Sequence, residues 1–210
     1  NNFNDIAGLF AEVGKPTDSL VNFVSSTSST KPGSYAVNVT TLATQGNATG
    51  SAAAGLTITA GVNDELLLVL DGVNATVTLP AGTYTASSLA AQVQSTINGT
   101  AAYSSVGAAV SVTQSAGVVS ITSNSYGSAS GVSATGNGAL NLLGGAPTIT
   151  AGVNAAGTIN GAAANGTGQY LTGATGSVTE GLKIQIVGGA TGARGTLDFS
   201  QGYAYKLDTL

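Results

Sequence analysis

The chain has 210 residues, of which 7% are charged, and its formal net charge at pH 7 is −4. It contains no His or Cys, which excludes a Ser-His-Asp triad, a Cys/His nucleophile pair, a disulfide framework and a zinc site of the usual ligand types. No two cationic residues are neighbours, whereas nucleic-acid binding needs a concentrated basic patch. We therefore expect no nucleic-acid partner.

The longest apolar run, Leu66–Leu70, has the length of a strand and is far below the roughly 20 residues of a membrane-spanning helix. We expect no membrane insertion. The sequence starts at Asn1 and shows no charged segment followed by an apolar one, as a signal peptide would. We interpret it as the middle of a longer chain.

Residues 1–32 are predicted to form short helical turns and a linker. Apolar residues there follow a nearly helical spacing, at Phe3, Ile6, Leu9, Phe10 and Val13. Gly14 and Pro16 end this pattern, and a second short turn or strand follows from Asp18 to Val24. A Ser/Thr-rich connector then leads to residue 33.

Residues 33–147 are predicted to form a β-rich domain. From Ser34 to Thr41, residues rich in β-branched side chains alternate with period two, which indicates a strand. Asp71-Gly72, between Leu66–Leu70 and Val73–Leu79, predicts a hairpin with a type I′ turn. A second hairpin is expected where 109–113 and 118–123 are joined by residues 114–117.

One helix is predicted, from Thr85 to Asn98. Thr85 or Ser87 provides the N-cap, and Leu89, Val93 and Ile97 form a narrow apolar stripe that would pack on one sheet. Asn98-Gly99 is expected to end the helix in a left-handed conformation.

Residues 148–210 are predicted to form a second β-rich unit that leads into a truncated stalk. Four expected strands are separated by turn signals, at 158–160, 169–172, 182–187 and 195–199. A final helix is expected at 203–210. The fold class is therefore mainly β, with two sandwich-like antiparallel units and one short helix packed on a sheet.

Two stretches resemble the family of flagellar filament-capping proteins, also called hook-associated protein 2. The run TEGLKIQIVGGATGARGTLDFSQGY, from Thr179 to Tyr203, resembles that family's GLxIxVxGGxTGxRGTVxFSxG stretch. The run KPGSYAVNVTTLA, from Lys31 to Ala43, is similar to its GxYxVxVxxLA strand. Residues 66–121 look like the insertion motif shared by flagellins and hook-associated proteins. The resemblance covers most of the chain, and GGATGARGT is its most specific part.

The resemblance implies a structural protein outside the cell, at the tip of the bacterial flagellar filament. In this family, coiled-coil legs plug the growing filament, β-rich heads form an oligomeric plate, and the cap promotes insertion of flagellin. The legs are not in this sequence. The implied partners are flagellin and further copies of the chain, and we expect the fragment alone to be monomeric or only weakly self-associating.

A different function class is compatible with the strand pattern alone. The chain would then be a surface recognition module, such as a flagellin variable region or an adhesin, that binds host glycan or mucin. Tyr103, Tyr126 and Tyr170 lie beside Gly/Ser-rich segments, where exposed tyrosines suit a recognition surface or cover sheet edges. The GGATGARGT run argues against this alternative.

The remaining candidate sites favour structural interpretations. The Gly188–Gly195 loop lacks the Lys of a P-loop and joins two strands, so a β-turn is predicted. Asn63, Asp64, Glu65 and Asp71 lack calcium-loop spacing and are interpreted as turn-flanking residues. Five Asn-x-Ser/Thr sequons are attributed to chance, at Asn38, Asn47, Asn74, Asn98 and Asn165. We expect no catalytic residue, no metal and no cofactor.

Overall fold

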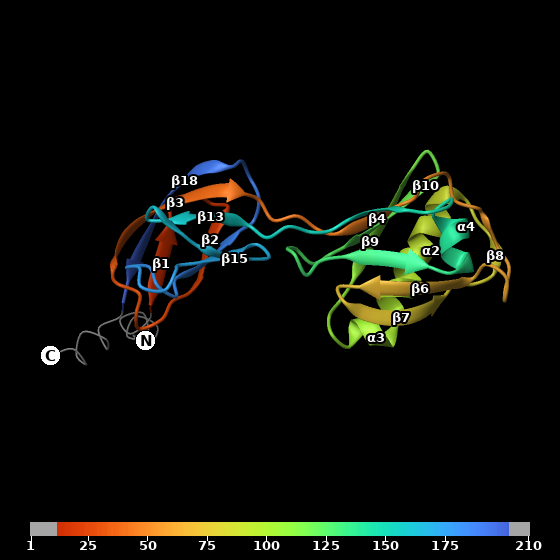
Figure 1. Ribbon diagram of the computed structural model, residues 1–210, viewed down its shortest axis with the longest axis horizontal. Helices are drawn as coiled ribbons and strands as arrows, with labels where there is room; N and C mark the ends of the chain where they lie inside the picture. Colours follow the sequence, from red (N-terminus) through yellow and green to blue (C-terminus); the bar gives the residue numbers. More distant parts are fainter. Residues whose placement is uncertain (1–11, 202–210) are drawn as a thin grey trace, which may run out of the picture. The chain divides into compact units, whose positions relative to one another are not determined.

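The computed structural model describes residues 12–201, which fold into two compact units (Figure 1). The first, here called the split unit, contains residues 12–43 and 154–201. The second, the inserted unit, contains residues 44–153. Strands make up 43% of the structure and helices 13%, which confirms the prediction of a mainly β chain.

The split unit contains two antiparallel sheets. One has the strand order β1 (Val13–Pro16), β18 (Gly192–Ser200), β3 (Gly33–Thr41), β13 (Ala156–Ile159) and β14 (Ala162–Ala163). The other has the order β15 (Asn165–Thr167), β16 (Tyr170–Thr172), β17 (Lys183–Ile186) and β2 (Val21–Ser25). Both sheets contribute to one hydrophobic cluster, so the unit is a β-sandwich.

Strict alternation builds the core of the split unit. Tyr35, Val37 and Val39 of β3 are buried, while the residues between them are exposed. Ile184 and Ile186 of β17 supply the facing layer from the other sheet. The strand expected at 182–187 is therefore confirmed, as Lys183–Ile186.

The inserted unit combines three antiparallel sheets with three helices. The sheets have the orders β12 (Thr148–Thr150), β4 (Asn47–Thr49), β10 (Val118–Ser123), β9 (Val110–Ser115); β11 (Val132–Thr135), β6 (Glu65–Leu70), β7 (Val73–Thr78); and β5 (Thr57–Ile58), β8 (Gly82–Thr83). The helices are α2 (Ala86–Gly99), α3 (Ala101–Ser104) and α4 (Asn137–Leu142).

No helix among residues 12–201 is both long and apolar enough to cross a bilayer.

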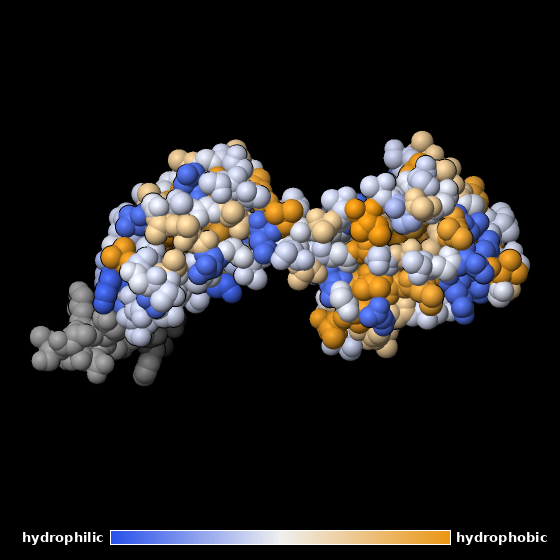
Figure 2. Space-filling view, viewed as in Figure 1, coloured by the Kyte–Doolittle hydropathy of each residue, from blue (hydrophilic) through white to orange (hydrophobic). Residues whose placement is uncertain are grey.

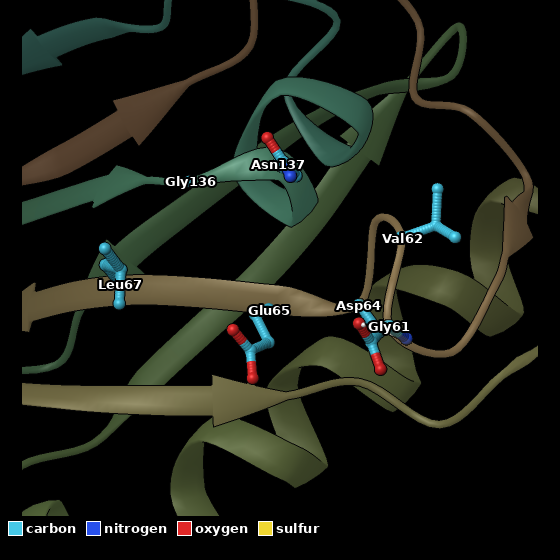
Figure 3. Close-up of a pocket in the computed structure, with 7 residues that line it drawn as sticks. All are labelled: Gly61, Val62, Asp64, Glu65, Leu67, Gly136 and Asn137. Carbon is cyan, nitrogen blue, oxygen red and sulfur yellow. Dashed lines mark hydrogen bonds between the residues drawn. The ribbon is translucent and has the colours of Figure 1, made fainter.

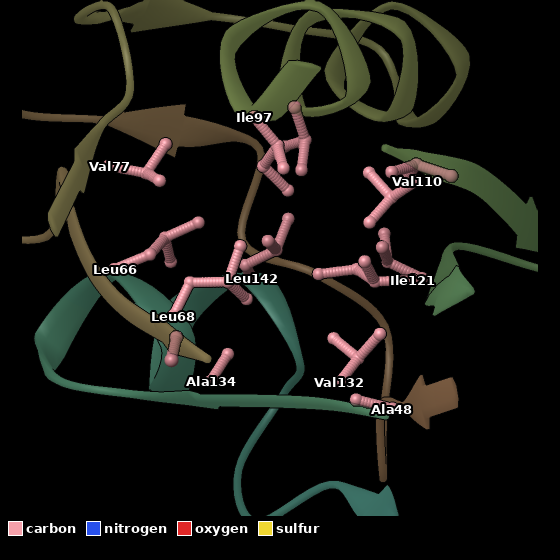
Figure 4. Packing of buried hydrophobic residues seen from close by; sticks show 14 of the residues in the cluster. Ala48, Leu66, Leu68, Val77, Ile97, Val110, Ile121, Val132, Ala134 and Leu142 are labelled. Carbon is pink, nitrogen blue, oxygen red and sulfur yellow. The ribbon is translucent and has the colours of Figure 1, made fainter. Parts of the chain in front are cut away.

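One hydrophobic cluster fills the inserted unit, and Figure 4 shows Leu66, Leu68, Ile97 and Ile121 converging in it. Leu89, Val93 and Ile97, the stripe expected from the sequence, are buried on α2. The helix packs against β9, as predicted for a helix lying on a sheet.

Both predicted hairpins are present. Asp71 and Gly72 have φ of 51° and 83°, the positive values that a type I′ turn needs. In the second hairpin the strands continue to Ser115 and resume at Val118, so the turn is only Ala116-Gly117 and is two residues shorter than expected.

The start of the predicted helix is confirmed and its end is wrong. Thr85 is the N-cap, and its side chain accepts a hydrogen bond from the Ser88 N–H. The helix runs through Gly99, and the C-cap Thr100 is extended instead of left-handed. Asn98 does not end it, because its side chain accepts from the Val110 N–H at 2.8 Å and donates to the Val110 carbonyl at 3.0 Å.

Replacing Gly99 with alanine is therefore expected to stabilise the inserted unit by about 0.5–1 kcal/mol, the difference in helix propensity between these residues. A Cβ at Gly99 meets nothing within 4 Å. The matched control is Gly72→Ala, which places a side chain at φ 83° and should destabilise by about 1 kcal/mol. Urea unfolding measures both. Equal losses of stability for the two variants would indicate that Gly99 has a left-handed conformation and ends the helix.

The structure divides the chain differently from the consecutive segments 1–32, 33–147 and 148–210. Residues 33–41 form β3, which pairs with β13 and β18 and so belongs with the C-terminal segment. The described part of 1–32 forms the strands β1 and β2 instead of helical turns. Both differences arise because strands pair with partners far away in the sequence, which leaves no local sequence pattern. The expectations for residues 1–11 and 203–210 lie outside the described residues.

Candidate functional site

Residues 188–191, the first half of the predicted 188–195 turn, join β17 to β18 and are organised around one buried side chain of β18. Arg194 is 6% exposed, and its Nη1 donates to the carbonyl oxygens of Gly188 at 2.7 Å and Ala190 at 3.1 Å. The turn directs these carbonyls toward the Arg194 guanidinium, whereas a phosphate cradle offers N–H groups to its ligand. A strand-to-strand turn is present as predicted, but it is shorter than expected because β18 begins at Gly192 instead of Gly195.

The other side of this guanidinium holds the N-terminal segment. Arg194 Nε donates to Asp18 Oδ2 at 2.5 Å. Next to this pair, the Thr17 N–H donates to the Thr196 carbonyl at 2.8 Å, and the Thr196 N–H donates to Thr17 Oγ1 at 2.9 Å. We call Thr17, Asp18, Arg194, Gly195 and Thr196 the clasp. It joins segments that are more than 170 residues apart in the sequence.

Two glycines are needed around the clasp. An added Cβ at Gly189 would lie 2.8 Å from Arg194 Nη2, and one at Gly195 would lie 2.2 Å from Thr17 Oγ1. Both residues also have positive φ, 89° and 72°. The most specific part of the sequence resemblance thus has a structural explanation, since its glycines leave room for the arginine and for Thr17.

Lowering the pH is expected to weaken the clasp. The hydrogen bond from Arg194, helped by the Leu20 N–H, holds the pKa of Asp18 below its ordinary value of 3.8. The contribution of the clasp is therefore complete above that pH and is lost as the pH falls through the lower folded-state pKa.

As the pH is lowered below about 4, the melting temperature of the split unit should fall more steeply in the unmodified chain than in Asp18→Asn. Calorimetry or circular dichroism measures the two profiles. Parallel profiles would contradict the linkage of this carboxyl to folding.

The acidic residues near β6 differ in their exposure and in their hydrogen-bond partners. Asp64 is 8% exposed, and its Oδ1 accepts from the Gly61 N–H at 3.0 Å. Asp71 accepts from the Ser123 hydroxyl at 2.9 Å and the Gly131 N–H at 3.0 Å. Glu65 is exposed on the outer face of the sheet. Asn63 accepts from the Thr59 N–H at 2.6 Å and holds its own loop. Among residues 12–201, no three possible ligand side chains gather to hold a metal ion.

The three tyrosines differ in their surroundings. Tyr103 was expected at the surface, but it is fully buried and its hydroxyl donates to the Leu68 carbonyl at 2.7 Å. The reason is that α3 follows directly after α2 and places Tyr103 in the core. Tyr126 is 40% exposed. Tyr170 is half-buried, with the Lys183 Nζ 4.4 Å from its ring centre.

Three adjoining hollows follow the outer face of the β11-β6-β7 sheet. The first, shown in Figure 3, lies between Glu65 and Leu67 of β6, the loop at Gly61–Asp64 and the start of α4 at Asn137. Leu67 also lines the second hollow, and Val69 lines the second and the third, where Ile149 of β12 is a further lining residue. We call the three hollows together the trough. On the visible face of the inserted unit, hydrophobic residues gather in the region where Figure 1 draws β6 (Figure 2).

The sequence interpretation identified neither the trough nor Asp18. A signal for the trough was present, because Leu66–Leu70 is apolar at every position. In a strand of an antiparallel sheet this pattern places Leu67 and Val69 on the face opposite to the core. Asp18 had no local signal, since its partner lies 176 residues away.

The two-unit arrangement can be compared with known proteins. No protein-family model and no curated protein matches the sequence. Solved structures do match, and they define the class: the chain has the fold of the D2-D3 domains of bacterial flagellar cap proteins.

The individual matches are to the cap protein FliD. With the D2-D3 domains from Escherichia coli, the TM-score is 0.58 and the identity 21%, over 91% of this chain and 100% of that one. With the D2-D3 domains from Serratia marcescens, the TM-score is 0.53 and the identity 20%, over 79% of this chain and 92% of that one. With the Escherichia coli D1-D2-D3 structure, the TM-score is 0.61 and the identity 19%, over 95% of this chain. There the chain spans 59% of the matched length.

Proposed function

We propose that this chain is the head part of a bacterial flagellar filament cap. It is a non-enzymatic structural protein that acts outside the cell at the filament tip and promotes the insertion of flagellin. The observation that carries the proposal is the match of both units to the D2-D3 domains of FliD from Escherichia coli, which are covered completely. The GGATGARGT run supports it independently.

The split unit suits attachment to a stalk. β1 and β18 are antiparallel neighbours, with Val13 opposite Ser200, so the described chain enters and leaves this unit at the same end. Two legs that continue from these strands would start side by side, as a coiled-coil pair requires. The clasp lies at the other end of β1, after Pro16, and fixes β18 against the N-terminal segment.

Deletion of the complete gene in the source bacterium tests the proposal. The mutant should lack normal filaments and release flagellin monomer into the medium, and the complete gene should restore filaments. Normal filaments with unchanged flagellin in the medium would contradict it. Normal filaments together with lost binding to mucin would favour the recognition module.

Self-association of the head alone should be weak. The chain has 5% aromatic residues and five Lys plus Arg, so it is poor in the residue types that usually anchor interfaces. Legs would raise the effective concentration of one head beside the next. In analytical ultracentrifugation at micromolar concentration, we expect the fragment to be monomeric and the full-length protein to form a ring. A stable closed oligomer of the fragment would contradict this expectation.

A further inference from the structure

The inserted unit has an unusual distribution of charge. All five cations of the chain lie outside residues 44–153, at Lys15, Lys31, Lys183, Arg194 and Lys206. The unit itself contains three acids and no cation, a formal charge of −3. Asp64 and Asp71 are engaged by backbone N–H groups. Within the described residues, no hydrogen bond or ion pair engages the carboxylate of Glu65.

Glu65 stands at one end of an apolar row in the trough. Glu65, Leu67 and Val69 share the outer face of β6, because Leu66, Leu68 and Leu70 between and beside them are buried. Ile149 of β12 lines the third hollow together with Val69. Leu67 and Ile149 are 52% and 53% exposed, which is high for large apolar side chains in adjoining hollows.

Small polar side chains flank this row on both neighbouring strands. Leu67 lies between Thr76 of β7 and Thr135 of β11, and Val69 lies between Asn74 and Ser133. These hydroxyl and amide groups can bond to the main chain of a bound peptide. No aromatic side chain lines the three hollows, so the trough lacks a stacking platform for a sugar ring.

We propose that the trough binds an extended polypeptide segment of a partner protein. Apolar side chains of the segment lie over Leu67, Val69 and Ile149, and a Lys or Arg side chain pairs with Glu65. The charge of the inserted unit favours a cationic partner, and the separation of Glu65 from Val69, about 13 Å along the strand, suits five to six extended residues.

The test uses two synthetic hexapeptides and the isotopically labelled chain. One peptide has lysine first, valine at its third and fifth positions and threonine elsewhere; the other has glutamate in place of lysine. In NMR titrations to millimolar peptide, amide shifts should be confined to β6, β7, β11 and β12. The lysine peptide should bind at least about fivefold more tightly than the glutamate peptide, and this ratio should shrink in high salt.

Variants of exposed residues separate the two parts of the proposal. Glu65→Lys should reverse the preference between the peptides, and Leu67→Ser should weaken both, while the spectra away from the trough stay unchanged. Equal affinities for the two peptides, shifts elsewhere, or no shifts would overturn the proposal. So would trough shifts with a mucin-type disaccharide and none with the lysine peptide, because the site would then be a glycan site. Each result is independent of filament assembly in cells.

Discussion

Replacing Leu66 with alanine is expected to lower the free energy of unfolding of the inserted unit by about 2–5 kcal/mol, the range for a buried leucine. Leu66 is fully buried in the cluster that also receives Ile97 from α2. Removing Cγ and its two methyl groups leaves a cavity in this cluster, which neighbouring side chains fill only in part. Urea unfolding followed by circular dichroism measures the loss.

Leu67→Ala is the matched control for this experiment. Leu67 is the next residue on the same strand and is 52% exposed, so its replacement should change the free energy by only about 0.5 kcal/mol. Similar losses for the two variants would mean that β6 is buried on both faces or shifted by one residue. Either result would also remove the structural basis of the trough.

Replacing Arg194 with methionine should lower the melting temperature of the split unit by at least about 5 °C. The change removes donors to Asp18, Gly188 and Ala190 at once, and it leaves the Asp18 carboxylate without its cation. Arg194→Lys should restore less than half of the loss, because one ammonium group does not reproduce the planar arrangement of donors. Scanning calorimetry measures all three proteins.

Lys183→Met is the control for loss of a positive charge in the same unit. Lys183 is half-buried on β17 and contacts the Tyr170 ring, without an ion pair among the described residues. Its replacement should leave the melting temperature nearly unchanged. If both variants lost the same stability, net charge would explain the effect and the clasp would carry none of it.

Features with local determinants could be predicted from the sequence. The Asp71-Gly72 turn and the helix cap depend on neighbouring residues; the turn was predicted correctly, and Thr85 was one of the two caps predicted. The end of α2 was not, because Asn98 bonds to Val110 on a strand that follows later in the chain. The pairing of β3 with β18 and the Asp18–Arg194 contact also join distant segments, so no periodicity or turn residue announces them.

The exposure of residues on the candidate surfaces also depends on distant parts of the chain. The strand through Leu66–Leu70 was predicted, but which of its residues face solvent depends on the sheet that forms around it. Tyr103 was expected at the surface because its sequence neighbours are small, whereas its hydroxyl reaches the Leu68 carbonyl in the core. The local sequence therefore predicted which element a residue belongs to better than it predicted whether that residue is exposed.

The first and last residues of the inserted unit, Thr44 and Val153, are hydrogen-bonded to each other. The Thr44 N–H donates to the Val153 carbonyl at 2.9 Å, and the Val153 N–H donates to Thr44 Oγ1 at 3.0 Å. The 110 residues from Thr44 to Val153 are therefore an insertion at one point of the split unit's sequence, between Ala43 and Asn154. Genetic recombination at that single place can exchange, enlarge or delete the whole unit without rethreading any strand of its host, so the two units are free to evolve at different rates.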